Sequence, residues 1–261
     1  MSKSEFDDEF LRLVEEFNTS AGAVERRSKI LRALDLKPGD HILDIGSGPG
    51  HQVAEIAPLI APNGVVNGID VADSAIAIAR QRWAGLDNVE FSLGNAYKLP
   101  FGDSTFDAVM SSQVFEYLDD VARALSEAFR VLKPKGRILI HGTEWGALLW
   151  KSNDAERMER IMSIWDGHLA DPHLPQTLAK KFADAGFGSA KAEPVVHVET
   201  SYDSSSMSAI LMKFMVGYVV SQGVSQNEAD AWVADLLILG ASGDYFFNSN
   251  EYIFTAERPE V

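Results

Sequence analysis

The sequence predicts an α/β fold with a doubly wound, Rossmann-like and mostly parallel sheet that carries helices on both faces. The first observation is an alternation, between residues 37 and 142, of short apolar segments with longer segments of helical periodicity. The second is a glycine-rich segment, Gly46-Ser47-Gly48-Pro49-Gly50, placed directly after the first short apolar segment. Strands and helices that alternate at this spacing favour right-handed crossovers, which leave a parallel sheet covered on both sides.

Apolar periodicity and turn residues define the expected elements in chain order. Residues 5–17 and 23–34 show the spacing of amphipathic helices, and a Pro-Gly turn follows at 37–40. Short apolar runs then predict strands at 41–45, 65–70, 89–93, 106–111 and 137–141. The segments between them predict helices at 52–60, 74–83 and 121–132.

After Gly142 the alternation ends and helical patterns dominate. We expect helices at 147–164, 177–185, 206–221 and 226–239, and strands at 194–202 and 251–256, which bring the sheet to seven strands. No low-complexity linker separates these parts, so we predict one domain with a helical cap. Its expected parts are a helical lid at 1–36, a ligand-binding core at 37–142, a substrate cap with the sixth strand at 143–250, and the last strand at 251–258.

The composition is that of a folded protein with little affinity for polyanions. The chain has 261 residues, 46% of them hydrophobic, and its 23 Lys and Arg against 38 Asp and Glu give a net charge of −15. Such a surface repels phosphate backbones and anionic membranes, so we expect no nucleic-acid partner. The absence of cysteine excludes disulfides, thiolate nucleophiles and Cys-ligated metals.

Neither an export signal nor a membrane span is expected. The first ten residues carry acids where a signal peptide needs a basic start and an apolar stretch. The longest apolar run, 207–220, contains Lys213 and is shorter than the roughly 20 residues of a membrane span. We therefore predict a cytoplasmic protein.

The glycine-rich segment is the strongest local indication of a binding site. Glycines at alternate positions let the backbone approach a ligand closely, and the following helix N-terminus adds a partial positive charge. The spacing is G-x-G-x-G, however, which differs from the dinucleotide fingerprint G-x-G-x-x-G and from the phosphate-binding loop. Because Pro49 also lacks a donor, a nucleotide-like ligand with little or no phosphate is favoured. A tight strand-to-helix turn without a ligand is the alternative.

Two polar residues at the ends of later strands favour a bound ligand over a turn without one. Asp70 ends the second expected strand, where a carboxylate can accept hydrogen bonds from both hydroxyls of a ribose. Asn95 follows the third strand and can pair with the edge of an adenine.

Four runs in this order resemble the class I S-adenosylmethionine-dependent methyltransferases: HILDIGSGPG, GIDVAD, LGNAYKLPFGDSTFDAVMSSQVFEYLDD and VLKPKGRILI. The chain is most similar to the small-molecule branch typified by ubiquinone and menaquinone biosynthesis methyltransferases, and the resemblance covers about residues 31–142. It implies S-adenosylmethionine as cofactor and methyl transfer to a carbon, oxygen or nitrogen atom of a small organic acceptor.

The resemblance also implies which residues bind the cofactor. The residues around its methionine part would be Asp44, Gly46, Ser47, Gly48 and Gly50. Asp70 would hold the ribose, Val71 would pack on the adenine, and Asn95 with Ala96 would read the adenine edge. The floor near the methyl group would be lined by Ser111, Ser112 and Gln113. The family usually has Asp at the position of Asn95, so we expect weaker adenine recognition.

A sulfonium methyl group is already activated, so alignment and desolvation can suffice and a catalytic base is not obligatory. His141 or Glu144 could accept a proton from the acceptor, and His168 and His173 could line the substrate pocket or lid. Each residue also has a structural alternative. His141 could be a hydrogen-bonded core histidine, Glu144 a solvent-exposed acid, and His168 and His173 could cap helices. No metal site is expected, because the histidine spacing is not H-E-x-x-H and Pro172 interrupts any shared helix face.

Aromatic and sulfur-containing side chains suggest how the remaining parts act. Phe17, Phe115 and Tyr117 could contact the sulfonium, with core packing as the alternative for Phe115. The aromatic and methionine stripe of the cap comprises Trp145, Trp150, Trp165, Met158 and Met162. Helix packing accounts for most of this stripe, and part of it could face an apolar or aromatic acceptor.

Two other functions stay open at this point. A nicotinamide-dependent oxidoreductase could use a similar sheet, although the glycine spacing disfavours it. A subunit that binds S-adenosylmethionine without transferring the methyl group is the second alternative.

Overall fold

The structure is a computed structural model that describes residues 8–260. The start of the first expected helix, at residues 5–7, lies outside the described residues. The chain divides into two compact units. The core unit contains residues 27–143, 174–194 and 252–260, and the cap unit contains residues 8–26, 144–173 and 195–251. The expected boundaries at residues 36, 142 and 250 stay predictions.

The sheet of the core unit has the predicted doubly wound order. Its strands are β1 (His41–Ile45), β2 (Val65–Asp70), β3 (Val89–Leu93), β4 (Phe106–Ser112) and β5 (Leu132–Thr143). Neighbours follow the order β3-β2-β1-β4-β5, and all these pairs are parallel. The chain order therefore reverses between β1 and β4, where open α/β sheets bind ligands at the carboxyl ends of their strands. The predicted α/β fold class is confirmed.

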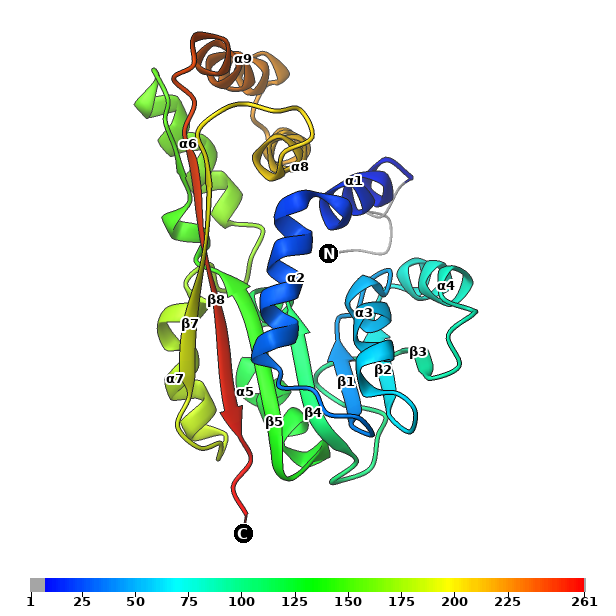
Figure 1. Cartoon of the computed structure of the whole chain (residues 1–261). Coiled ribbons are helices and arrows are strands. Elements are labelled where there is room, and N and C mark those ends of the chain that lie inside the picture. The colour runs from blue at the N-terminus through cyan, green and yellow to red at the C-terminus, as the bar shows by residue number, and fades with distance from the viewer. Residues whose placement is uncertain (1–7, 261) are drawn as a thin grey trace. The chain divides into compact units, whose positions relative to one another are not determined.

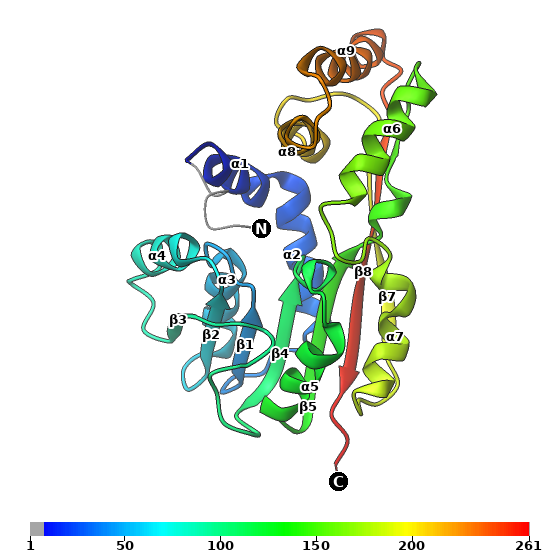
Figure 2. The ribbon, with the colours of Figure 1, turned by 180° about the vertical axis from the view of Figure 1, so that it is seen from behind.

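Helices cover both faces of this sheet (Figures 1 and 2). The helices α3 (His51–Ile60) and α4 (Asp73–Arg82) pack on β2 and β3, whereas α5 (Val121–Val131) and α7 (Leu174–Asp184) pack on β5. Strand residues on opposite faces, such as Ile42 and Leu43, are both fully buried. This double burial explains why the strands appear in the sequence as nearly continuous apolar runs.

The sheet has eight strands among the described residues, one more than predicted. The remaining strands are β6 (Leu149–Trp150), β7 (Lys191–Glu199) and β8 (Phe247–Glu257). The additional strand, β6, pairs antiparallel with β8 inside the region expected to be helical from residue 147. The helix α6 (Ala155–Asp166) starts later because the Asp154 side chain caps it, accepting a hydrogen bond from the Arg157 N–H at 2.9 Å.

The cap unit has its own apolar core. Its longer helices are α1 (Asp8–Thr19), α6, α8 (Met207–Ser221) and α9 (Gln226–Ser242), and α2 (Ala21–Ala33) starts in this unit and ends in the core unit. Trp145, Trp150 and Trp165 are buried in this core with Trp232. Packing therefore accounts for the three tryptophans of the aromatic and methionine stripe, which is the explanation that the sequence analysis favours for most of the stripe. None of the described helices combines the length and the apolar composition that a membrane span requires.

Candidate functional site

The glycine-rich loop connects β1 to α3 with all three glycines in the left-handed region. Their φ angles are 78° at Gly46, 52° at Gly48 and 83° at Gly50, which side chains rarely tolerate. A Cβ atom at Gly46 would lie 2.2 Å from Val114, and one at Gly50 would lie 2.6 Å from Phe91. At Gly48 nothing lies within 4 Å of such an atom. Gly46 and Gly50 thus allow tight packing, and Gly48 borders open space that a ligand can enter.

Asp70, at the end of β2, lies against this loop. Its carboxylate accepts hydrogen bonds from the Gly48 N–H and from the Ala72 N–H, each at 2.9 Å. Each carboxylate oxygen has two lone pairs, so both can still accept a ribose hydroxyl. The backbone N–H groups of Gly48 and Ala72 therefore hold Asp70, the residue predicted to bind the ribose, in place.

Asp44 is a buried carboxyl group beside the same loop. It lies on β1 and is 2% exposed. Burial raises the pKa of Asp44 to about 7, and the charge of Asp70 adds to this rise. A cationic ligand would favour the ionised form, and S-adenosylmethionine carries both a sulfonium and an ammonium group.

The predicted adenine contacts lie at the ends of β2 and β3. Val71 is 72% exposed, so its apolar side chain is accessible to cover a planar ring. The Asn95 Oδ1 accepts a hydrogen bond from the Tyr97 N–H at 2.8 Å, which commits part of its acceptor capacity to a local turn. Asn95 can still donate through its amide group, and Ala96 beside it is buried. The assignments of Val71, Asn95 and Ala96 stay predictions.

The carboxyl ends of β4 and β5 form a polar cluster. Ser112 Oγ lies 2.9 Å from Nδ1 of His141, which is fully buried, and Gln113 donates from Nε2 to Thr143 Oγ1 at 2.7 Å. Gln113 has a φ of 59°, an unusual conformation for a residue other than glycine. Ser111 instead donates to the Ile45 carbonyl at 2.7 Å, which binds β4 to β1. Sequence reasoning does not identify Thr143, because no sequence motif surrounds it; its role as the partner of Gln113 is seen only in the structure.

Three buried polar atoms near the loop make no hydrogen bond within the protein. They are Ser47 Oγ, Gln52 Nε2 and Gln113 Oε1, from the glycine loop, the start of α3 and the end of β4. Buried polar groups usually have a partner, so this set suits a polar ligand. A free carboxylate can accept hydrogen bonds from the donors, and an ammonium can donate to Gln113. The methionine part of S-adenosylmethionine carries both groups, so these residues fit it.

Gln52 is absent from the sequence prediction. It is buried on α3 together with Val53, Ile56 and Ile60. A polar residue on an apolar helix face, two positions after the last loop glycine, is the signal that could have identified it.

The candidate proton acceptors are distributed between the units. His141 belongs to the core unit, whereas Glu144, His168 and His173 belong to the cap unit. Glu144 and His173 form a hydrogen bond through Oε1 and Nδ1. No group of three potential metal ligands lies together within residues 8–260.

His168 packs in an aromatic cluster of the cap unit. Its ring stacks on Trp165 with centroids 3.7 Å apart, and the rings of Trp145 and Tyr218 contact it edge-on. Burial lowers the pKa of His168 to about 4, so this imidazole is neutral at physiological pH. A packing role accounts for these contacts, and its role in the substrate pocket stays a prediction.

The aromatic candidates for sulfonium contact also differ in their surroundings. Phe115 is fully buried in the apolar core, which fits its core-packing alternative. Phe17 contacts the Arg26 guanidinium, which lies 5.0 Å from its ring centroid. Tyr117 is 38% exposed and follows buried Glu116.

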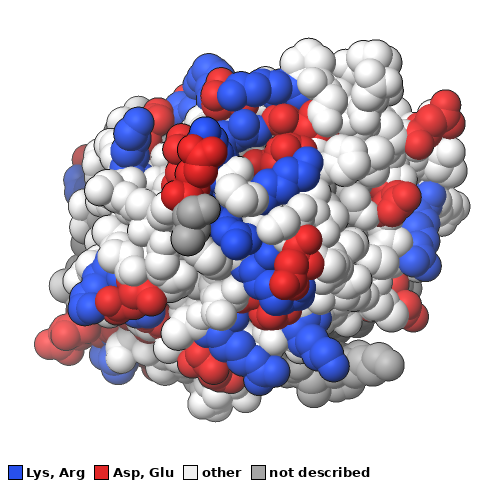
Figure 3. Space-filling view, turned by 90° about the horizontal axis from the view of Figure 1, so that it is seen from below, with Lys and Arg blue, Asp and Glu red and all other residues white. Residues whose placement is uncertain are grey.

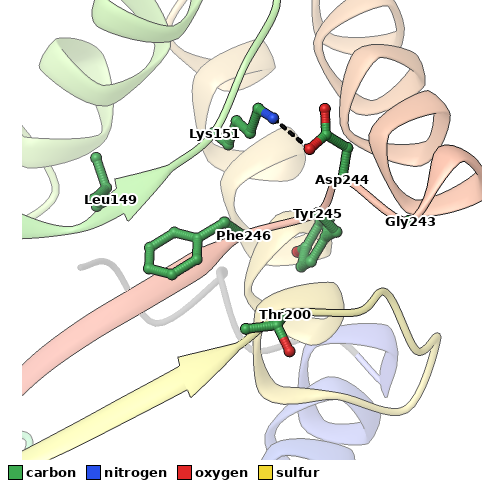
Figure 4. A pocket seen from close by; sticks show the side chains of 7 residues that line it. All are labelled: Leu149, Lys151, Thr200, Gly243, Asp244, Tyr245 and Phe246. Atoms are coloured by element: carbon green, nitrogen blue, oxygen red, sulfur yellow. Dashed lines mark ion pairs between the residues drawn. The ribbon is translucent and has the colours of Figure 1, made fainter.

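The cap unit also contains an open cavity of about 500 Å³ (Figure 4). Leu149 and Phe246 give it an apolar wall, and Thr200 and Tyr245 also line it. Its two charged lining residues, Lys151 and Asp244, form an ion pair at 2.5 Å. The cavity therefore offers apolar surface and a neutralised pair of charges.

One face of the molecule shows charges of both signs. On the face shown in Figure 3, Lys and Arg side chains are interspersed with Asp and Glu. Ion pairs such as Lys133 with Asp107 and Arg130 with Glu127, each at 2.8 Å, neutralise several of the bases.

Comparison with known proteins places the chain in a family. A family model described as a methyltransferase domain matches residues 36–186. The chain is 38% identical over 124 residues to a demethylmenaquinone methyltransferase of Symbiobacterium thermophilum, a match that spans 46% of this chain and 49% of that protein. It is also 28% identical to an uncharacterised 37.1 kDa protein in transposon TN4556 of Streptomyces fradiae, over 94% of this chain and 70% of that protein.

Solved structures show the same fold. Phosphoethanolamine N-methyltransferase 2 of Haemonchus contortus, in complex with S-adenosyl-L-methionine, superposes with a TM-score of 0.66 at 20% identity. That match covers 98% of this chain and 58% of the other. The chain spans about half the length of the demethylmenaquinone methyltransferases that it matches.

The fold and the loop thus define a class I S-adenosylmethionine-dependent methyltransferase. The chain belongs to the methyltransferase-domain family, with relatives among the menaquinone and ubiquinone methyltransferases. The predicted class and the predicted cofactor of the family are confirmed, and a nicotinamide-dependent oxidoreductase is not favoured.

Proposed function

We propose that this protein transfers the methyl group of S-adenosylmethionine to a small organic acceptor. The observation that carries this proposal is the contact between the Gly48 N–H and the Asp70 carboxylate, beside open space at Gly48. The demethylmenaquinone methyltransferases among its relatives support an apolar or aromatic acceptor. Their similarity spans less than half of this chain, so the acceptor itself is part of the proposal.

Residues of the core unit would hold the cofactor. Asp70 would accept hydrogen bonds from the ribose hydroxyls, and Asp44 would offset the positive charge of the ligand. The ligand's carboxylate would accept hydrogen bonds from Ser47 and Gln52, and Gln113 would accept one from its ammonium group. When bound, the cofactor supplies a methyl group that is already activated by its positive sulfur.

The polar cluster at the ends of β4 and β5 would line the methyl-transfer site. Ser112 and Gln113 are each tied to a buried residue of β5, which fixes their side chains before a ligand binds. Such preorganisation aligns reacting groups without a further entropic cost during the reaction. His141 is more suited to orienting Ser112 than to exchanging protons with solvent, because it is fully buried.

Calorimetric titration with S-adenosylhomocysteine tests the cofactor site. Asp70→Asn should weaken binding about 10- to 100-fold, because hydrogen bonds to a charged acceptor contribute about 1.5–3 kcal/mol. Asp73→Asn is the matched control, since Asp73 is an exposed carboxylate three positions later at the start of α4. Equal affinities for both variants, or binding of NAD instead, would contradict the site.

Methyl transfer itself needs a second measurement. Transfer of labelled methyl groups to a panel of small apolar and aromatic acceptors should occur with the unmodified protein. Tight cofactor binding without transfer to any acceptor of the panel would favour a binding subunit instead. The cytoplasm stays the predicted location, which fractionation of the producing cells would test.

A further inference from the structure

The indole of Trp83 is hydrogen-bonded to the glycine-rich loop. Trp83 directly follows α4, is half-buried, and donates from Nε1 to the Pro49 carbonyl at 2.9 Å. The same ring lies against the next residue of the loop, because a Cβ atom at Gly50 would lie 2.9 Å from Cδ1 of Trp83. All three residues belong to the core unit, so this contact lies within one compact part of the protein.

The peptide group between Pro49 and Gly50 is held on both sides. Its carbonyl accepts the bond from Trp83, and its N–H, which belongs to Gly50, donates to the Ser47 carbonyl at 3.0 Å. A planar peptide group whose donor and acceptor are both bonded has a fixed orientation. Gly50 is also the N-cap of α3, so this peptide group sets the direction in which the helix begins.

The indole is itself fixed by contacts to neighbouring elements. Arg80 donates from Nε and Nη2 to the Phe91 carbonyl at 3.0 and 2.8 Å, which joins the end of α4 to β3. The Trp83 N–H continues α4 by donating to the Ala79 carbonyl at 3.0 Å. The ring of His51, the first residue of α3, contacts the indole edge-on with centroids 5.9 Å apart. Trp83 therefore connects α4 to the loop and to the start of α3.

The backbone donors of the loop are all used within the protein. The N–H groups of residues 46 and 47 donate to the Ile69 carbonyl at 2.7 and 2.9 Å, and those of residues 48 and 50 donate to Asp70 and Ser47. Residue 49 is a proline and has no N–H. An anionic ligand group at this loop therefore depends on donors from side chains and from the start of α3.

Two buried side chains can supply these donors. Ser47 is 8% exposed and Gln52 is 7% exposed, and among the described residues neither Ser47 Oγ nor Gln52 Nε2 has a hydrogen-bond partner. They lie on either side of the peptide group that Trp83 holds, three residues before and two residues after Gly50. The distance between the two donors therefore depends on the conformation of this short segment.

We propose that Trp83 is a positioning residue for the cofactor. Its indole N–H holds the Pro49 peptide group so that Ser47 and Gln52 together donate to the carboxylate of the methionine part. This inference rests on the proposed function and assigns the recognition of one part of the ligand. The nucleoside part should depend much less on the indole, because Asp70 is also fixed by the Ala72 N–H.

The test compares two probes by calorimetric titration of Trp83→Phe, which keeps an aromatic ring but lacks the N–H. Affinity for S-adenosylhomocysteine should fall about 3- to 10-fold, the usual net contribution of one neutral hydrogen bond. Affinity for 5′-methylthioadenosine should be unchanged, because this probe has the nucleoside and the sulfur but no carboxylate. A merely structural role of Trp83 would weaken both probes alike.

Trp150→Phe is the matched control. Trp150 also donates from Nε1 at 2.9 Å, to the Tyr245 hydroxyl, but this bond lies in the cap unit. The control should leave both affinities unchanged. Ser47→Ala should lower the affinity for S-adenosylhomocysteine alone, and its effect should be less than additive with Trp83→Phe, since both changes weaken the same carboxylate contact.

Hydrogen exchange in the unmodified protein is a second measurement that needs no variant to fold. Exchange of the Trp83 Nε1–H should be slowed more by S-adenosylhomocysteine than by 5′-methylthioadenosine, because a bound carboxylate stabilises the segment that the indole holds.

Four results would overturn the assignment. They are an unchanged affinity of Trp83→Phe for S-adenosylhomocysteine, an equal loss for both probes, strict additivity with Ser47→Ala, and equal slowing of exchange by the two probes. Failure of the proposed function itself is distinguishable, because S-adenosylhomocysteine would then not bind even to the unmodified protein.

Discussion

The Gly48 N–H and the Asp70 carboxylate are joined by a hydrogen bond of 2.9 Å that connects the loop after β1 to the end of β2. The loop and the carboxylate are therefore one preformed structure rather than two parts that a ligand must bring together. Preformed sites lose less conformational entropy on binding.

Gly48→Ala should impair ligand binding more than it impairs folding. Its φ of 52° costs a side chain about 1 kcal/mol, but nothing within 4 Å would clash with the new atom. The methyl group would occupy space that the cofactor needs, so affinity for S-adenosylhomocysteine should fall at least tenfold. Gly39→Ala is a matched control, because Gly39 also has a positive φ and open space. A similar loss of stability in both variants with equal affinities would refute this role of Gly48.

Gly46→Ala should impair folding itself. The new Cβ would lie 2.2 Å from Val114, so the loop or the segment that follows β4 must shift. We expect about 1–3 kcal/mol of destabilisation, the usual range for an overpacked site. Val114→Ala should recover part of this loss, which a double-mutant cycle of urea unfolding would measure. Strictly additive effects would show that the two side chains do not clash.

Asp44 should make the stability of the protein depend on pH. Its pKa is about 7 when folded and near 3.8 when unfolded, so the folded state binds the proton more tightly. The resulting stabilisation is complete below pH 3.8 and is lost as the pH rises to about 7. Asp44→Asn should remove this slope and stabilise the protein at pH 8, on the order of a few kcal/mol. Denaturant unfolding between pH 5 and pH 8 measures the difference, and parallel curves for the two proteins would contradict it.

Cofactor binding should release a proton from the same group. A cationic ligand favours the ionised carboxylate of Asp44, so affinity for S-adenosylmethionine should rise as the pH increases through about 7. Calorimetry at pH 6.5 in two buffers with different ionisation enthalpies would measure the released proton. Asp44→Asn should abolish the buffer dependence, whereas Asp73→Asn should retain it. Identical heats in the two buffers for the unmodified protein would argue against this coupling.

Arg26 and Glu251 should stabilise the cap unit as a pair. Their side chains are 8% and 4% exposed, and the charged atoms lie 3.5 Å apart. Arg26→Met leaves a buried carboxylate without this cation and should cost about 3–5 kcal/mol. The double variant Arg26→Met with Glu251→Leu should be more stable than Arg26→Met alone. A surface pair such as Lys180 with Asp184 should contribute less than about 1 kcal/mol in the same cycle.

The sequence predicts the core well because its elements obey local rules. The strands β1, β2 and β3 have the bounds that the sequence predicts, and β1 is buried at four of its five residues, as expected for a central parallel strand. Gly46, Gly48 and Gly50 also each have a positive φ angle, which explains why glycine occurs at these positions.

The cap is less predictable because its contacts join distant segments. The Asp154 cap delays α6, and β6 forms because Leu149 and Trp150 pair with Asn248 and Phe247, nearly a hundred residues away. The pairing of Glu144 with His173 likewise depends on tertiary structure, since no helical or strand periodicity joins them.

The two units are interleaved along the chain, and this arrangement determines when each can fold during synthesis. The cap unit includes residues as late as 251, and the core unit includes residues 252–257 of β8. Domains ordinarily fold as units while the chain emerges from the ribosome. Here the cap unit is complete only after residue 251 has been released, and the core unit only after the rest of β8 has followed, so both reach their final fold late in translation.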